Sequence, residues 1–382
     1  MHMRIKYNKV LILVIVAGGF AILGSTMSKS PTLPLYAKSL GLSDPEIGVV
    51  AAASTITGII INFVSGLLSD IYGRKKLLIA SGTVFFTAPL LYFLAKSALT
   101  LASVRAYYGL ATAIFVPVSL ALISDLYPSR KGTFMGLLSS ATLIGRAAAP
   151  TIAGTLIYMY GFPPVFVLCS ATGLIALLLI SMLPIREEKI RRETKISFKL
   201  VISPWLIPIG IVDAVVYMAY QGIETFLPLF QVLKDRAWLA GLILTIEVGV
   251  MALVKPIGGY LSDRIGRIRP VVFGLLLLTL SMFTIAKSSM IPLIIASVVL
   301  FAIAASITTA STKPLATDIA RYSGAAIGLL ESIKDIGQAL GPIVVSVVGI
   351  SVGYISIGIL SLLSLLIFLI SMRYYNIPSK PF

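Results

Sequence analysis

The chain has very few charged residues for its length. Only 12% of its 382 residues are Asp, Glu, Lys or Arg, whereas 58% are hydrophobic and the mean hydropathy is +1.00. Soluble domains carry about 25% charged residues, so this composition excludes an ordinary soluble fold. The apolar runs are long, and a helix that crosses a bilayer needs roughly 20 apolar residues. The sequence therefore predicts an integral membrane protein.

The chain also has few residues suited to metal, redox or phosphate chemistry. Cys169 is its one cysteine and His2 its one histidine, which excludes an intramolecular disulfide and a cysteine-rich metal site. The Gly-rich segments lie in apolar runs and do not form a phosphate-binding loop. We therefore expect no enzyme activity, no cofactor and no metal. The net charge of +16 comes from short Lys and Arg clusters between apolar runs, which is typical of membrane topology and not of nucleic-acid binding.

The apolar runs predict an all-α integral membrane fold with twelve transmembrane helices in two pseudo-symmetric six-helix bundles. We expect helices at 10–36, 46–69, 77–95, 99–123, 132–158, 164–183, 201–230, 238–262, 271–286, 291–312, 324–350 and 353–372. The first run has no clean cleavage site after it, which predicts a retained helix and not a signal peptide. Residues 1–184 should form the N-terminal bundle, 185–199 a cytoplasmic linker, and 200–382 the C-terminal bundle.

The distribution of Lys and Arg predicts that both termini are cytoplasmic. With that orientation most basic residues outside the helices lie inside the cell. The outer segments hold five: Lys38, Lys96, Lys234, Arg236 and Lys287. This asymmetry follows the positive-inside rule, and we expect a multi-pass protein of the cell membrane.

One short motif occurs twice, about half the chain length apart. Gly66–Lys76 reads GLLSDIYGRKK and Gly259–Arg269 reads GYLSDRIGRIR. Asp263, Gly266 and Arg267 repeat Asp70, Gly73 and Arg74 at an offset of 193 (263 − 70). Gly337 and Pro342 likewise repeat Gly145 and Pro150 at an offset of 192 (337 − 145). Two parallel repeats predict a cleft at the pseudo-two-fold axis, where repeat-built transporters bind substrate near the bilayer midplane.

These motifs resemble those of the major facilitator superfamily, and the resemblance covers the whole chain. Gly66-x-x-x-Asp70-x-x-Gly73-Arg74-Lys75 resembles the loop motif of that family, and Arg105-x-x-x-Gly109 resembles its second motif. Gly145-x-x-x-Ala149-Pro150-x-x-Ala153-Gly154 is similar to the antiporter motif, with Ala149 and Ala153 where Gly is usual. Gly337-x-x-x-Gly341-Pro342 is a fragment of the same motif. The resemblance, closest to the drug:proton antiporter branch, implies a secondary transporter that works by alternating access.

The loop motif has two interpretations. Asp70 ends a predicted helix, where the helix dipole disfavours an anion, so it should have a partner, either Arg74 or the N-terminus of the helix at 324–350. The resemblance implies an interdomain latch that favours the state closed to the inside. The alternative is a basic turn that only sets topology. Gly73 should permit the tight turn, and the gating set comprises Gly66, Asp70, Gly73, Arg74, Gly259, Asp263, Gly266 and Arg267.

Small residues in the helices at 132–158 and 324–350 predict close helix packing. Gly145, Gly154, Gly337 and Gly341 let backbones approach, and Pro150 and Pro342 permit bends. We expect the first of these helices to pack against the helix at 238–262.

Ionisable residues inside predicted spans are the candidates for transport chemistry, because each is costly in a bilayer. The resemblance makes Arg105 the arginine that tunes proton transfer; the alternative is that it extends to the outer surface. Asp213, Glu247 and Glu331 are the proton-carrier candidates. The alternative is a structural salt-bridge network, such as Glu247 with Lys255 or Glu331 with Lys334. The full set is Lys29, Arg105, Arg146, Asp213, Tyr217, Tyr220, Glu224, Glu247, Lys255, Lys313, Glu331, Lys334 and Asp335.

The sequence leaves three functions open. The first is proton-coupled efflux of small organic compounds, and the second is proton-coupled uptake or exchange of an organic anion, which Lys29, Arg105 and Arg146 would favour. The third is a sensor or scaffold that does not transport. The expected partners are a small-molecule substrate, protons and the lipid bilayer, with the chain as a monomer.

Overall fold

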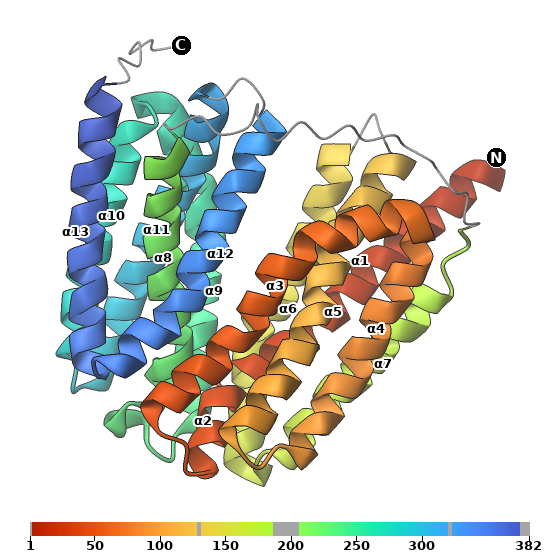
Figure 1. The fold of residues 1–382 in the computed structure, drawn as a ribbon, viewed down its shortest axis with the longest axis horizontal. Coiled ribbons are helices and arrows are strands. Elements are labelled where there is room, and N and C mark those ends of the chain that lie inside the picture. Colours follow the sequence, from red (N-terminus) through yellow and green to blue (C-terminus); the bar gives the residue numbers. More distant parts are fainter. Residues whose placement is uncertain (1, 128–130, 186–205, 320–322, 375–382) are drawn as a thin grey trace. The chain divides into compact units, whose positions relative to one another are not determined.

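The structure is a computed structural model that describes residues 2–127, 131–185, 206–319 and 323–374. Nearly all of these residues are helical, and the described part contains twelve long helices and one short helix, α2 (Figure 1). The prediction of an all-α fold with twelve long helices is confirmed. Residues 186–199 of the predicted linker lie outside the described residues.

The contacts between helices divide the chain into two compact units. Of the described residues, unit 1 comprises 2–127, 131–185 and 235–245, and unit 2 comprises 206–234, 246–319 and 323–374. The sequence analysis assigned residues 235–245 to the C-terminal bundle. These residues contain the first turns of α9 (Ala237–Ile265), so this one helix contributes to both units.

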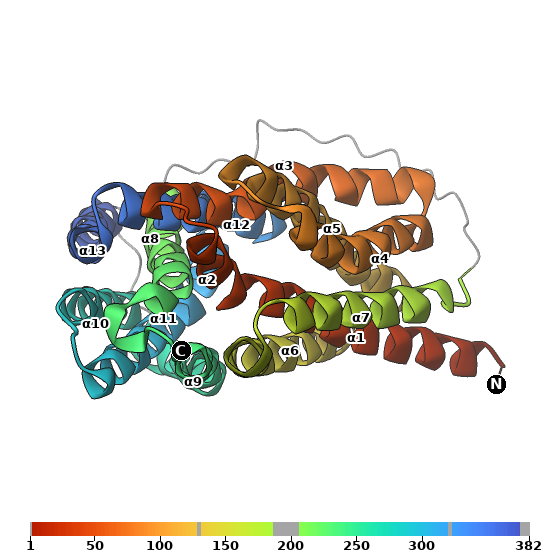
Figure 2. The same ribbon diagram turned by 90° about the horizontal axis from the view of Figure 1, so that it is seen from below.

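Unit 1 is built from seven helices that precede the linker. They are α1 (His2–Lys29), α2 (Thr32–Ser39), α3 (Asp44–Tyr72), α4 (Arg74–Leu91), α5 (Ala98–Leu126), α6 (Lys131–Tyr160) and α7 (Pro163–Ser181), with a short 3-10 turn, η1 (Tyr92–Leu94). Within the unit, α3 and α4 pack on α5, α1 packs on α6 and α7, and α4 packs on α7 (Figure 2).

Unit 2 contains α8 (Leu206–Phe226), α10 (Ile268–Ala286), α11 (Ile291–Ile319), α12 (Ser323–Val347) and α13 (Ile350–Tyr374), together with most of α9. Two 3-10 turns, η3 (Leu227–Leu229) and η4 (Gln231–Leu233), follow α8. Helix α8 packs against α11, α12 and α13, and its surface is buried along most of its length. This central place in unit 2 buries four polar side chains of α8: Asp213, Gln221, Glu224 and Thr225.

Two of the predicted helices that end earlier than expected do so just before a proline. The predicted helix 10–36 breaks after Lys29, and α2 begins at Thr32 after Pro31. The predicted helix 201–230 ends at Phe226, before Pro228 in the turn η3. Proline has no backbone N–H to donate to the preceding helical turn, which explains both ends.

Ten segments of the described residues are long and apolar enough to cross a membrane. Helices α6 and α12 are not among them. Helix α6 contains Arg146 and many Gly, Ala, Ser and Thr residues, and α12 contains Glu331, Lys334 and Asp335. The two long helices that are not among these ten segments therefore occupy corresponding places in the two repeats.

Candidate functional site

A buried carboxyl group lies at the centre of unit 2. Asp213, on α8, is only 1% exposed, and its Oδ1 accepts a hydrogen bond of 2.7 Å from the Thr312 hydroxyl on α11. No cation among the described residues lies within ion-pair distance of Asp213. Thr312 was not among the predicted residues. Its partnership depends on the packing of α8 on α11, which the sequence does not reveal.

Four charged side chains on α11 and α12 form a network beside this carboxyl. Glu331 pairs with Lys313 and, at 2.6 Å, with Lys334. Lys334 also pairs with Asp335 at 3.0 Å, and its Nζ lies 5.1 Å from the centre of the Tyr217 ring. Two positive and two negative charges therefore balance within the network.

The network and Asp213 are electrostatically coupled. Lys313, Glu331 and Lys334 all lie near enough to Asp213 to interact with it through their charges. An ionised Asp213 would therefore add a fifth, unbalanced charge to a balanced group of four. We refer to Asp213, Thr312, Lys313, Glu331, Lys334 and Asp335 together as the charge cluster.

A row of polar side chains continues from the charge cluster along α8. Tyr217, Gln221 and Thr225 follow Asp213 at steps of four residues and so share one helix face. Gln338 of α12 donates a hydrogen bond of 3.0 Å to Gln221, and the Gln221 amide lies 3.4 Å from the Thr225 hydroxyl. The sequence analysis missed both glutamines, although the four-residue spacing from Asp213 could have identified Gln221.

Close approach of α12 to α8 brings this polar face and the charge cluster together. A side chain at Gly337 would meet the backbone of Ala214, and one at Gly341 would meet the backbone of Met218. Only glycine leaves room for backbones at this separation. These two glycines of the antiporter-like fragment thus position Glu331 and Lys334 above α8.

The other candidate residues of the second half are more scattered. Glu247 on α9 is 1% exposed and Glu224 on α8 is buried, whereas Lys255 on α9 is exposed. Tyr220 stacks on Phe301 of α11, with the ring centres 6.5 Å apart. Among the described residues, no three His, Cys, Asp or Glu side chains come together as metal ligands.

Arg105 is a buried cation of unit 1. It is 3% exposed on α5, and its guanidinium donates to Ser54 Oγ of α3 at 2.7 Å and to the Tyr92 hydroxyl at 3.3 Å. Both partners are neutral. Its side chain lies inside the bundle, which speaks against the alternative that Arg105 extends to the surface. Arg146 on α6 is exposed and Lys29 on α1 is half-buried.

The small residues of α6 pack against α1 and against the first turns of α9, which belong to unit 1. A side chain at Gly145 would meet the backbone of Gly19 and Leu23 on α1, and one at Gly154 would meet Ala237 and Trp238 at the start of α9. The Thr151 hydroxyl, one residue after Pro150, also donates to the Thr245 hydroxyl of α9 at 2.8 Å. Helix α9 is the helix that the sequence analysis expected as the partner of this motif.

The two loop motifs form matching ion pairs. In unit 1, Arg74 bonds to Ser69 and to Asp125 at the end of α5, at 3.3 Å. In unit 2, Arg267 bonds to Asp263 and to Asp318 at the end of α11, at 3.3 Å. Fifty-one residues separate Arg from Asp in both cases. Asp125 and Asp318 were absent from the predicted set, although the repeat placed them at equivalent helix ends.

The turns of both motifs depend on glycine. Gly73 has a φ of +96° and Gly266 a φ of +88°, a region that other residues rarely adopt. Burial opposes the charge of Arg267, but the hydrogen bonds and charges of Asp263 and Asp318 outweigh it and raise the pKa of the guanidinium above its ordinary value. The side chain of Asp70 lies outside the described part of the structure, and so do the surroundings of Gly66. The predicted latch therefore stays a prediction.

Comparison with known proteins agrees with the family that the motifs resemble. The model of the Major Facilitator Superfamily matches residues 14–246 and 237–381. An uncharacterized MFS-type transporter of Methanocaldococcus jannaschii is 29% identical over 329 residues, which cover 82% of this chain and 84% of the relative. The multidrug resistance protein MdtG of Serratia proteamaculans is 27% identical over 349 residues, covering 85% and 83% of the two chains.

Solved structures share the fold at lower identity. A bacterial homolog of the human lysosomal transporter Spinster aligns with a TM-score of 0.78 at 15% identity, over 97% of this chain and 96% of that one. The nucleoside transporter NupG also gives a TM-score of 0.78 at 15% identity, over 96% and 100% of the chains. This chain therefore belongs to the major facilitator superfamily and is a multi-pass membrane protein and secondary transporter, not an enzyme.

Proposed function

We propose that this protein is a proton-coupled exporter of small organic compounds and that Asp213 is the carboxyl group that binds the coupling proton. The observation that carries the proposal is the burial of Asp213 with a single hydroxyl partner beside four charges that already balance. An ionised carboxylate is costly at such a site unless a cation pairs with it. A proton on Asp213 makes the charge cluster neutral, and its loss leaves one negative charge.

The other two carboxyl candidates are less suited to carry the proton. Glu331 makes ion pairs with two lysines, and breaking both for each proton would cost free energy in every cycle. Glu247 is buried on α9 and is not a member of the charge cluster. We therefore rank Asp213 first and keep Glu247 and Glu331 as comparison sites.

Export as the direction rests on the relatives and on the motif in α6. Several relatives at 24–30% identity are named multidrug resistance protein MdtG, and Gly145, Pro150 and Gly154 follow the antiporter motif. The excess of Lys and Arg in one set of loops supports both termini on the cytoplasmic side. The default for this architecture is a monomer that binds one small-molecule substrate.

The test uses purified protein in proteoliposomes with an imposed pH gradient. A one-unit gradient can drive about a tenfold accumulation of a substrate exchanged one-for-one with protons, since a tenfold ratio corresponds to ~1.4 kcal/mol. Asp213→Asn keeps an acceptor for Thr312 but cannot bind the proton. We expect it to lose the gradient-driven accumulation while substrate exchange at equal pH continues.

Matched variants make this result specific. Asp44→Asn changes an exposed acid that pairs with Lys38 and should leave driven transport unchanged. Glu247→Gln and Glu331→Gln identify the carrier if Asp213→Asn retains driven accumulation, which would overturn the assignment of Asp213. Flux that is absent for a broad panel of substrates would instead favour a sensor or scaffold.

Uptake or exchange of an organic anion is the second candidate. Arg105 favours it, because this buried cation has neutral hydrogen-bond partners and could pair with an anionic substrate. Replacing Lys29 and Arg146 by glutamine should then abolish anion binding. Transport that survives both substitutions rules out an anion site built from Lys29 and Arg146.

A further inference from the structure

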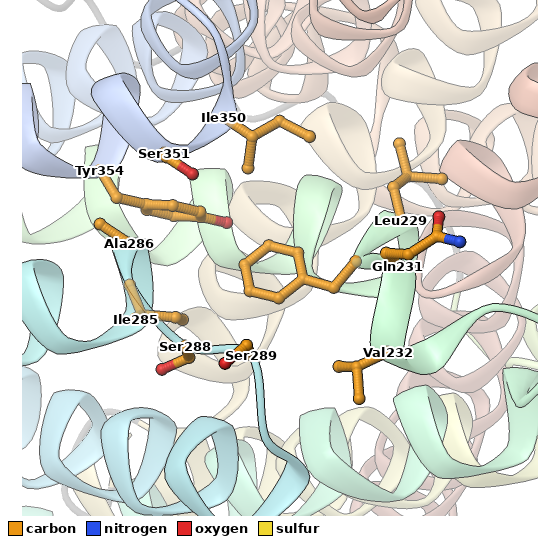
Figure 3. Close-up of a pocket in the computed structure, with 11 residues that line it drawn as sticks. Leu229, Gln231, Val232, Ile285, Ala286, Ser288, Ser289, Ile350, Ser351 and Tyr354 are labelled. Atoms are coloured by element: carbon orange, nitrogen blue, oxygen red, sulfur yellow. The ribbon is translucent and has the colours of Figure 1, made fainter.

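A pocket of about 450 Å³ opens at one end of unit 2, at the end of the bundle opposite the Gly259–Arg269 motif. Three segments surround it: the turns after α8, the end of α10 and the start of α13 (Figure 3). Its volume lies within the range of roughly 300–1,000 Å³ that is typical of small-molecule sites. None of its lining residues belongs to the charge cluster.

The internal repeat provides an equivalent place in unit 1. Phe230 follows Leu227-Pro228-Leu229 as Tyr36 follows Leu33-Pro34-Leu35. At the offset of the loop motifs (193), Ile285 and Ala286 of α10 correspond to Tyr92 and Phe93 of η1. Gly161 and Gly349, both with positive φ, precede α7 and α13, so Ile350 corresponds to Phe162 and Tyr354 to Phe166.

In unit 1 these positions form a filled aromatic cluster. The Tyr36 ring lies 5.2 Å from Phe162 and 5.1 Å from Phe166, between ring centres. Tyr92 stacks on Phe166 at 4.9 Å, and Phe93 meets Phe166 edge-on at 5.5 Å. The Tyr36 hydroxyl lies within hydrogen-bond distance of two backbone carbonyl oxygens, 3.0 Å from that of Tyr92 and 3.2 Å from that of Ala95.

In unit 2 the same positions hold smaller side chains. Phe230 and Tyr354 still meet edge-on, with ring centres 6.1 Å apart. The other three rings of the cluster are replaced by Ile285, Ala286 and Ile350, and all three replacements line the pocket. The pocket is thus the space that aromatic rings fill in the first repeat.

We propose that this pocket binds a neutral aromatic molecule of one or two rings. The unit 1 cluster shows that this packing geometry accommodates aromatic rings, and Phe230 and Tyr354 remain to contact them. No charged side chain is among the described residues that line the pocket, which favours a neutral ligand. Ser288, Ser289 and Ser351 are among its lining residues, and their hydroxyl oxygens can accept a hydrogen bond from one polar substituent of the ligand.

Benzophenone is a suitable probe, because it is neutral, has two rings and forms covalent adducts under near-ultraviolet light. Purified full-length protein is illuminated with benzophenone, and the modified peptides are mapped by mass spectrometry. We expect adducts in 229–232, 285–289 and 350–354, and we expect excess naphthalene to compete with them.

The aromatic residues of unit 1 indicate which variants should weaken binding to the pocket. Ala286→Phe and Ile350→Phe restore the rings found at Phe93 and Phe162, so they should fill the pocket. We expect each to lower the adduct yield in these segments about tenfold, which corresponds to ~1.4 kcal/mol of binding free energy. Val352→Phe, at an exposed position of α13 outside the pocket, is the matched control and should label as the wild type does.

The outcomes separate this proposal from its competitors and from the proposed transport function. Adducts that naphthalene does not compete, or that persist in both filled variants, would overturn it. A phospholipid that copurifies with the wild type and is lost from the filled variants, without competable adducts, would assign the pocket to a lipid chain and also overturn it. Because the readout is binding, its failure is independent of the gradient-driven transport assay.

Discussion

Replacement of Gly337 by alanine tests the close packing of α12 on α8. A Cβ at this position would lie about 2.5 Å from the Ala214 Cα and 2.6 Å from its carbonyl carbon. Both obstructing atoms belong to the backbone, so no side-chain rotation can relieve the clash. The two helices must separate, and the separation moves Glu331 and Lys334 away from the face of α8 that carries Asp213.

The magnitude follows from two opposing effects. Overpacking of a tight contact costs about 1–3 kcal/mol, whereas replacing a helical glycine by alanine gains up to about 1 kcal/mol. Gly249 on α9 isolates the second effect, because a Cβ there would have nothing within 4 Å. We therefore expect Gly337→Ala to be less stable than Gly249→Ala by about 1–3 kcal/mol.

The assay is unfolding of the purified protein in detergent, followed with both variants and the wild type under identical conditions. Gly249→Ala should unfold at or above the wild-type temperature and Gly337→Ala below it, with a parallel loss of gradient-driven transport. A Gly337→Ala protein as stable and active as Gly249→Ala would show that α12 and α8 do not pack as closely as described, and the reasoning about the charge cluster would lose its support.

Three further predictions concern single charges. Glu331→Gln should lower the free energy of unfolding by about 1–2 kcal/mol, because two partly exposed ion pairs are lost. Adding Lys334→Gln should recover part of this free energy in the same unfolding assay. If the losses of the two single variants simply add in the double variant, the network is contradicted. Asp318→Asn should leave Arg267 paired with Asp263 alone and lower stability by less than about 1 kcal/mol, so a larger loss measured by unfolding would mean that this pair is more important than its exposure suggests. Asp70→Asn should reduce transport in proteoliposomes while substrate binding, measured by thermal shift, persists; wild-type flux would reduce the motif to a topology signal.

The fold was predictable because membrane helices have a strong and local signature. Each needs a run of apolar residues as long as the bilayer is thick, and the chain has such runs on either side of short polar turns. The boundary errors include those at Pro31 and Pro228, where a helix ends inside an apolar run. Hydropathy does not depend on the missing N–H of proline. The apolar pattern therefore continues past the proline, although the helical hydrogen bonds end there.

The candidate site was predictable only in part. Charged residues in apolar runs are conspicuous, and Asp213, Glu331 and Lys334 were found in this way. Thr312 and Gln338 are ordinary polar residues in a sequence, and they matter because of what they contact. Asp125 and Asp318 were visible as a repeat, but their pairing with Arg74 and Arg267 depends on helices that meet across 51 residues.

The sequence by itself determined the membrane location, the helix count, the internal repeat and the family, because each of these depends on composition and spacing along the chain. Only the tertiary structure decided that Asp213 lies beside four charges that already balance, which glycines meet a backbone, and where the second repeat leaves a pocket that the first repeat fills. These properties depend on side chains from separate helices meeting in space. Burial and ion pairing set the free energy of a charge, and the surrounding side chains set the size of a cavity. The sequence of one helix shows none of these.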